Sequence, residues 1–166
     1  MRYVGFLLLI LAGGSCGFLT ATQLRRRAQV LETTVCWIRY LQTEFRFHAT
    51  PLVRALEACA CQPAFRELTF LRESVTLSGS PAERLNTAIR QQARPLGLTV
   101  ADVEMMTQLC AGLGVTDLEG QLSHLEIYAA RLELQQTQAW EQYRCKGKVY
   151  RVLGLGASLA VALVLW

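Results

Sequence analysis

The sequence predicts an all-α protein, an antiparallel helical bundle of about six helices flanked by two transmembrane helices. Three observations predict this fold. Apolar residues make up 52% of the 166 residues and charged residues only 18%. The apolar excess is concentrated at the two ends of the chain. Between the ends, helix-capping signals recur, and the alternation typical of β-strands is nearly absent. The middle is long enough to bury a core of its own.

The two apolar ends have the length of membrane spans. Tyr3–Thr22 contains no charged residue, and Val149–Trp166 contains only Arg151. As helices they would extend about 30 and 27 Å, close to the thickness of the bilayer's hydrocarbon core. We therefore predict transmembrane helices at residues 3–22 and 149–166 and a helical bundle at residues 23–148.

Basic residues beside the two spans predict the orientation of the chain. They follow the first span and surround the start of the second: Arg25, Arg26, Arg27, Arg144, Lys146, Lys148 and Arg151. The positive-inside rule places these flanks and the middle domain in the cytoplasm, with both termini outside. Anionic membrane lipids attract such basic collars.

The body of the chain has the opposite charge balance. Between Ala28 and Tyr143 lie all 13 acidic residues but only 9 of the 17 basic residues. A nucleic-acid-binding domain would present a basic face there, and none is visible. The composition therefore favours a protein or lipid partner over nucleic acid.

The first apolar stretch has an alternative interpretation as a cleaved signal peptide, with Arg2 as its basic region and Val4–Ala12 as its apolar core. The protein would then be a cleaved or C-terminally anchored extracytoplasmic helical adaptor of the envelope. Gly13–Cys16 is a poor lipoprotein cleavage site, because glycine stands where a large aliphatic residue is expected. Cleavage would also leave the basic flank of the second span outside, against the positive-inside rule.

Six helices are expected between the spans. The first, from Arg25 to His48, carries an apolar face with helical spacing: Leu31, Val35, Ile38, Leu41 and Phe45. Proline, capping and glycine signals delimit the other five: Thr50 to Cys61, Pro63 to Gly79, Ser80 to Arg94, Thr99 to Gly114, and Thr116 to Tyr143.

The last of these helices carries a heptad seam: Leu118, Leu122, Leu125, Ala129, Leu132, Gln136, Ala139 and Tyr143. Such a seam requires a helix packed along its length, and the first helix is the expected neighbour, although a second chain remains an alternative. Only Gly147 separates the seam helix from the second span, so one helix can run through both.

No motif predicts catalysis, a metal site or a cofactor. The Gly147-Lys148 pair is not a phosphate-binding loop, because Gln142 occupies the first glycine position and Val149 the hydroxyl position. Cys59 and Cys61 are too closely spaced for a zinc knuckle. The six cysteines show no disulfide framework, and we expect them to be reduced thiols packed as small apolar groups.

Two sequence phrases carry a family resemblance. Glu44 is followed by Thr50-Pro51-Leu52, and Leu113–Leu125 reads L-G-V-T-D-L-E-G-Q-L-S-H-L. Together with two spans flanking a helical domain, they make the whole chain resemble the stage III sporulation protein AB family. This chain departs from the family pattern at Phe47-His48, where tyrosine-glycine is usual.

The resemblance implies a role that the residues alone do not. Proteins of this family resemble the F component of type II secretion machines, a helical membrane platform that receives a cytoplasmic hexameric ATPase. For this family, the ATPase is stage III sporulation protein AA. By resemblance, the chain is a non-enzymatic component of a sporulation-specific, secretion-like channel in the mother-cell membrane, together with other channel subunits.

Candidate partner-binding residues lie in the second phrase: Asp117, Glu119, Gln121 and His124. Asp117, Gln121 and His124 share one helix face. They can either satisfy nearby backbone groups and the helix dipole or form a polar contact strip for the ATPase or another subunit. Similarly, Trp37, Tyr40 and Phe47 can be core residues or exposed partner anchors.

Overall fold

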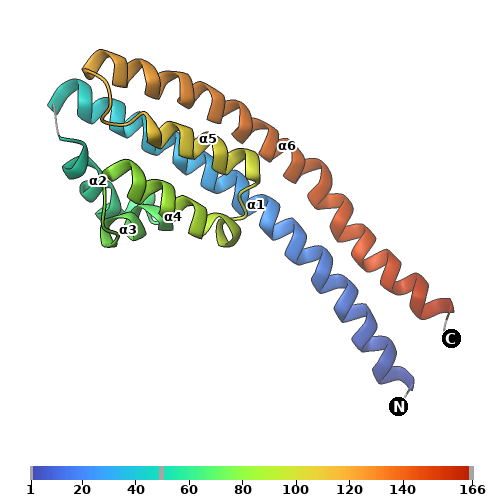
Figure 1. The fold of residues 1–166 in the computed structure, drawn as a ribbon. Helices are drawn as coiled ribbons and strands as arrows, with labels where there is room; N and C mark the ends of the chain where they lie inside the picture. The colour runs from blue at the N-terminus through green and yellow to red at the C-terminus, as the bar shows by residue number, and fades with distance from the viewer. Residues whose placement is uncertain (1, 49–50, 165–166) are drawn as a thin grey trace. The chain divides into compact units, whose positions relative to one another are not determined.

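The backbone in a computed structural model is described at residues 2–48 and 51–164, and side chains at residues 19–47 and 51–146. Within these ranges the chain is helical and contains no strand. The elements are α1 (Arg2–His48), α2 (Leu52–Cys61), the 3₁₀ helix η1 (Pro63–Phe65), α3 (Thr69–Thr76), α4 (Pro81–Leu96), α5 (Val100–Ala111) and α6 (Leu118–Val164) (Figure 1). The all-α prediction is confirmed for this part of the chain.

The two predicted spans are not separate helices. The first forms the beginning of α1 and nearly all of the second forms the end of α6. Most of their side chains lie outside the described residues. Among the side chains that are described, no helical stretch combines the length and the apolar character needed to cross a membrane. The two transmembrane helices therefore stay predictions.

The chain divides into two compact units. The terminal unit comprises Met1–Ala28 and Thr137–Trp166, and the central unit comprises residues 29–136. In the terminal unit, Arg27 Nη1 donates a hydrogen bond to Gln142 Oε1 at 3.0 Å, and the Arg27 side chain is buried. The remaining predicted flanking residues with described side chains are exposed: Arg25, Arg26, Arg144 and Lys146. Lys148 and Arg151 fall outside the described side chains.

In the central unit, α1 supplies the middle of the core. All five residues of its predicted apolar face are buried, together with Val30, Thr34 and Trp37. The Thr34 hydroxyl donates to the Val30 carbonyl oxygen at 2.7 Å, which satisfies this buried polar group. The ring of Trp37 meets Phe70 edge-on at 6.0 Å between centroids. Burial on a face this wide requires more than one neighbouring helix, while the opposite side of α1 stays exposed.

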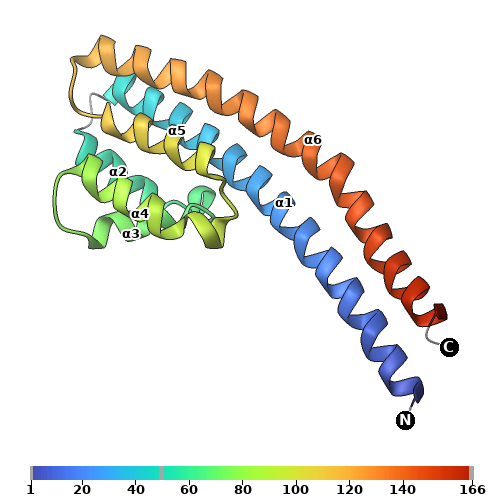
Figure 2. The same cartoon turned by 45° about the vertical axis from the view of Figure 1, so that its right-hand side comes forward.

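Helices α3, α4 and α5 pack against one another in chain order, and α2 packs on α3 (Figure 2). Leu125 and Leu132 of the heptad seam are fully buried and Ala129 is nearly so. Leu118 is 47% exposed, because it is the first residue of α6. The seam is therefore confirmed over its central part.

Two capping boxes set helix starts as predicted. Glu83 N donates to Ser80 Oγ at 3.3 Å, and Ser80 N donates to the Glu83 carboxylate at 3.1 Å. The hydrogen bond from Ser80 N, together with the Ser80 side chain, stabilises the ionised carboxylate and lowers the pKa of Glu83. Thr99 and Asp102 make the equivalent pair at the start of α5. Helix α4 passes the predicted end at Arg94 and stops at Gly97, whose φ is +73°.

The predicted helix from Pro63 to Gly79 is wrong in extent. It is divided into η1 and the shorter α3 by a turn that buries Leu68 completely. One uninterrupted helix would point residues 65 and 70 in widely different directions. The turn lets both Phe65 and Phe70 enter the core.

Candidate partner-binding surface

The predicted partner-binding residues lie at the corner between α5 and α6. Asp117 Oδ1 accepts a hydrogen bond from Gly120 N at 3.2 Å, and the Asp117 carbonyl oxygen accepts from Gln121 N at 2.9 Å. Asp117 is therefore the N-cap of α6, where its charge also favours the helix dipole. Its side chain and that of Glu119 remain exposed.

Gln121 and His124 hold the same corner through contacts with backbone carbonyl oxygens. Gln121 Nε2 donates to the Thr116 carbonyl oxygen at 2.8 Å. His124 Nε2 lies 3.0 Å from the Leu109 carbonyl oxygen, the distance of a hydrogen bond in which the ring nitrogen carries the proton. The half-buried imidazole also contacts the ring of Tyr128 at 4.6 Å between centroids.

Two glycines allow the corner to close. A side chain at Gly112 would overlap the imidazole of His124. Gly114 adopts a φ of +79°, and the position of its missing Cβ is 3.2 Å from Leu52 Cδ2. Leu52 of the first sequence phrase therefore lies against Gly114 of the second. Thr50, the predicted N-cap of α2, falls outside the described residues.

Three of the four predicted residues satisfy nearby backbone groups, which was one of the two interpretations of the sequence. Asp117, Gln121 and His124 all serve backbone groups. Glu44 of the first phrase accepts a hydrogen bond from the Tyr40 hydroxyl, which raises the pKa of Tyr40. The accessible part of the corner includes Asp117 and Glu119 with two exposed apolar neighbours, Val115 and Leu118.

The three candidate aromatic anchors have different environments. Trp37 is completely buried, and Tyr40 is half-buried with its ring 5.6 Å from that of Phe65. Phe47 is 73% exposed. Trp37 and Tyr40 are therefore packing residues, and only Phe47 is available to a partner.

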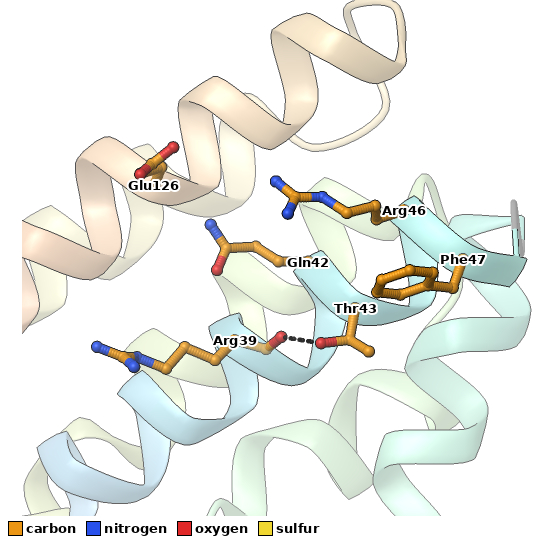
Figure 3. A pocket seen from close by; sticks show the side chains of 6 residues that line it. All are labelled: Arg39, Gln42, Thr43, Arg46, Phe47 and Glu126. Atoms are coloured by element: carbon orange, nitrogen blue, oxygen red, sulfur yellow. Dashed lines mark hydrogen bonds between the residues drawn. The ribbon is translucent and has the colours of Figure 1, made fainter.

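Sequence reasoning missed a pocket between α1 and α6. Its volume is about 340 Å³, and it is open to solvent. Five of its residues come from α1 and one from α6: Arg39, Gln42, Thr43, Arg46, Phe47 and Glu126 (Figure 3). The spacing of Arg39 and Arg46, one heptad apart, was a signal for a polar face on α1. Its location opposite Glu126 depends on the register of α1 against α6.

Charged residues on the two helices follow an antiparallel register. Arg39 of α1 forms an ion pair with Glu133 of α6, and the hydrogen bond to Glu133 raises the pKa of Arg39. Seven residues later in α1 is Arg46, and seven residues earlier in α6 is Glu126. The described part of the chain gives neither Arg46 nor Glu126 a hydrogen bond or ion pair.

The two buried thiols do not resemble catalytic nucleophiles. The five described cysteines are free, and only Cys59 and Cys110 are buried. Burial raises the pKa of Cys59 to about 11 and that of Cys110 to about 12. Such thiols are almost entirely protonated at neutral pH, and the thiolate is the nucleophile. The expectation that the cysteines are packed inside is wrong for Cys36, Cys61 and Cys145, which are exposed.

No metal-binding group of three or more His, Cys, Asp and Glu occurs among the described residues.

Comparisons with known proteins identify the family. No solved structure matches the chain. The chain is similar to the DNA replication and repair protein RecF of Synechococcus sp. (strain CC9605), with 31% identity over 103 residues. That match covers 62% of this chain but only 26% of RecF, so it does not establish a shared role. The family model of stage III sporulation protein AB matches residues 2–166. The chain therefore belongs to the stage III sporulation protein AB family.

Proposed function

We propose that the chain is a non-enzymatic membrane component of a sporulation-specific, secretion-like channel complex. In this proposal it docks a cytoplasmic ATPase of the stage III sporulation protein AA type at the mother-cell membrane. Membership of the family gives a role in sporulation, and its description names no enzymatic activity. The ATPase and the channel follow from the resemblance of the family to secretion platforms.

The observation that carries the docking role is the exposed part of the α5–α6 corner. Asp117 and Glu119 present two carboxylates beside the exposed side chains of Val115 and Leu118. The backbone beneath them is held by the contacts of Gln121 and His124, so little ordering is required on binding. A firm acidic and apolar surface suits a partner with basic and apolar groups.

The same proposal includes the membrane arrangement. The two predicted spans would cross the membrane at residues 3–22 and 149–166, with the basic flanks and the bundle in the cytoplasm and both termini outside. Membrane lipids and other channel subunits would contact the spans. Exposure of Arg25, Arg26, Arg144 and Lys146 is compatible with contact to lipid headgroups.

Docking can be tested with the full chain in nanodiscs and the purified stage III sporulation protein AA ATPase. Glu119→Lys and Asp117→Asn should each weaken binding, and asparagine keeps the capping ability of residue 117. We expect a loss of about tenfold for Glu119→Lys, typical of one interfacial charge pair. Glu104→Lys, at an exposed acidic residue of α5 away from the corner, is the matched control. Lack of binding by the unaltered chain would refute the docking role.

The membrane arrangement needs a separate test. Cys61 is suitable because its thiol is exposed, whereas Cys59 would be shielded by packing on either side of a membrane. In a variant that keeps Cys61 but has serine at the other exposed cysteines and at Cys16, an impermeant thiol reagent should label Cys61 only after the membrane is opened. Labelling in sealed cells would favour the extracytoplasmic adaptor.

A further inference from the structure

The pocket between α1 and α6 occupies a position where the register of the two helices brings opposite charges together. Arg39 and Glu133 form the ion pair at one level of this register. At the level one heptad away, Arg46 and Glu126 lie on opposite sides of the pocket (Figure 3). Neither has a hydrogen bond or ion pair among the described residues. At the pocket, the arginine of α1 and the glutamate of α6 are therefore not paired, whereas the arginine and glutamate one heptad away form an ion pair.

The other groups around the pocket leave these two charges as its main recognition elements. The Arg39 guanidinium is already paired with Glu133. The Thr43 hydroxyl donates to the Arg39 carbonyl oxygen at 3.0 Å. Phe47, 73% exposed, adds an apolar surface next to Arg46. A ligand therefore meets the cation of Arg46, the anion of Glu126, the side-chain amide of Gln42 and the aromatic ring of Phe47.

Building on the proposed function, we propose that this pocket receives a pair of oppositely charged side chains from the docked ATPase. An aspartate or glutamate of the partner would pair with Arg46, and a lysine or arginine beside it would pair with Glu126. An apolar residue of the same segment would cover Phe47. The binding site of the partner would thus extend from the acidic α5–α6 corner to the α1–α6 pocket.

The chemistry of the pocket favours a protein segment over a small anion or a lipid headgroup. A simple anion attracted by Arg46 would be repelled by Glu126 on the opposite wall. The volume of about 340 Å³ is at the lower end of the range for ligand pockets, and it can accept two side chains. Charges of both signs also fix the direction in which a segment can bind, which contributes specificity.

Charge reversal tests the proposal in the full chain in nanodiscs with the purified ATPase. Arg46→Glu and Glu126→Arg should each weaken binding about tenfold, and the double variant should stay weak because its polarity is inverted. Arg54→Glu, at an exposed arginine of α2 outside the pocket, should bind like the unaltered chain. Thermal unfolding should be unchanged in all of these variants, because both pocket residues are exposed.

The outcomes separate this inference from the proposed function. If the unaltered chain binds and neither reversal matters, the pocket is not part of the interface, while the docking role stands. Tighter binding of the ATPase to Glu126→Arg would show that the bound segment carries only acidic side chains. That result would overturn a site for two opposite charges. If the unaltered chain fails to bind, the proposed function fails and the ATPase is excluded as the ligand of the pocket.

Discussion

His124 Nε2 lies 3.0 Å from the carbonyl oxygen of Leu109, and this contact joins the last turn of α5 to the beginning of α6. The imidazole fills the space in which Gly112 would carry a side chain. Residues on both sides of the turn thus determine how closely α5 and α6 can pack at the corner.

Gly112→Ala should destabilise the protein through this ring. The backbone at Gly112 has φ −85° and ψ −10°, which alanine adopts readily, so the cost arises from steric overlap with His124. We expect the free energy of unfolding to fall by about 1–3 kcal/mol. Measured by chemical denaturation, the free energy of unfolding should fall less when Gly112→Ala is introduced into the His124→Ala variant. Equal losses in the two backgrounds would show that the ring is not responsible.

Gly114 should be sensitive for a different reason, its backbone conformation. At a φ of +79°, alanine is strained by about 1–2 kcal/mol, while asparagine tolerates this region better. Both substitutions add a Cβ that faces Leu52, so this contact largely cancels when the two variants are compared. Urea denaturation should rank Gly114→Asn as more stable than Gly114→Ala. The reverse order would contradict the argument.

The buried thiols should make stability fall at high pH. The pKa values of Cys59 and Cys110 rise to about 11 and 12 in the folded protein, from an ordinary value of 9.0. Because the folded state favours the protonated thiols, their contribution is complete below about pH 9 and is lost progressively above it. Equilibrium unfolding measured from pH 8 to pH 11 should show this decline. Cys110→Ala should flatten the decline, and an unchanged slope would contradict the assignment.

Alkylation at pH 8 should separate the cysteines by environment. Cys36, Cys61 and Cys145 are exposed and should react with iodoacetamide in the folded protein, whereas Cys59 and Cys110 should react only after unfolding. Peptide mass spectrometry after timed quenching can follow each thiol. Rapid modification of Cys110 in the folded state would show that its helix opens easily.

Truncation to alanine should lower stability strongly at one aromatic residue of α1 and hardly at another. Trp37→Ala removes a completely buried ring that contacts Phe70 and should cost about 3–5 kcal/mol. Phe47→Ala should change stability by less than about 0.5 kcal/mol, because Phe47 is mainly exposed. Phe47→Ala should instead weaken partner binding. A large stability loss at Phe47 would remove it from the proposed interface.

Local signals in the sequence predicted much of the fold. The capping boxes at Ser80 and Thr99 set helix starts through bonds between residues three positions apart, which a sequence displays directly. The apolar face of α1 was likewise visible from its spacing. The break between η1 and α3 was not, because it depends on three-dimensional competition for core positions among Phe65, Leu68 and Phe70.

The candidate surface was predicted only partly. Asp117 was expected near the start of a helix, and it caps α6. The contact of His124 with Leu109 could not be foreseen, because it depends on how α5 and α6 meet. The pocket requires the register of α1 against α6, a relation between segments about eighty residues apart in the chain. No local pattern contains that information.

The corner between α5 and α6 has a consequence for how such a protein can evolve. The phrase at Leu113–Leu125, which carries part of the family resemblance, consists largely of residues that shape the corner. Two of the charges proposed to recognise the partner, Asp117 and Glu119, lie inside that phrase, whereas Arg46 and Glu126 lie outside it. The fold of the corner and part of the proposed interface therefore depend on the same short segment, and a descendant has more freedom to change its binding partner at Arg46 and Glu126 than at the corner.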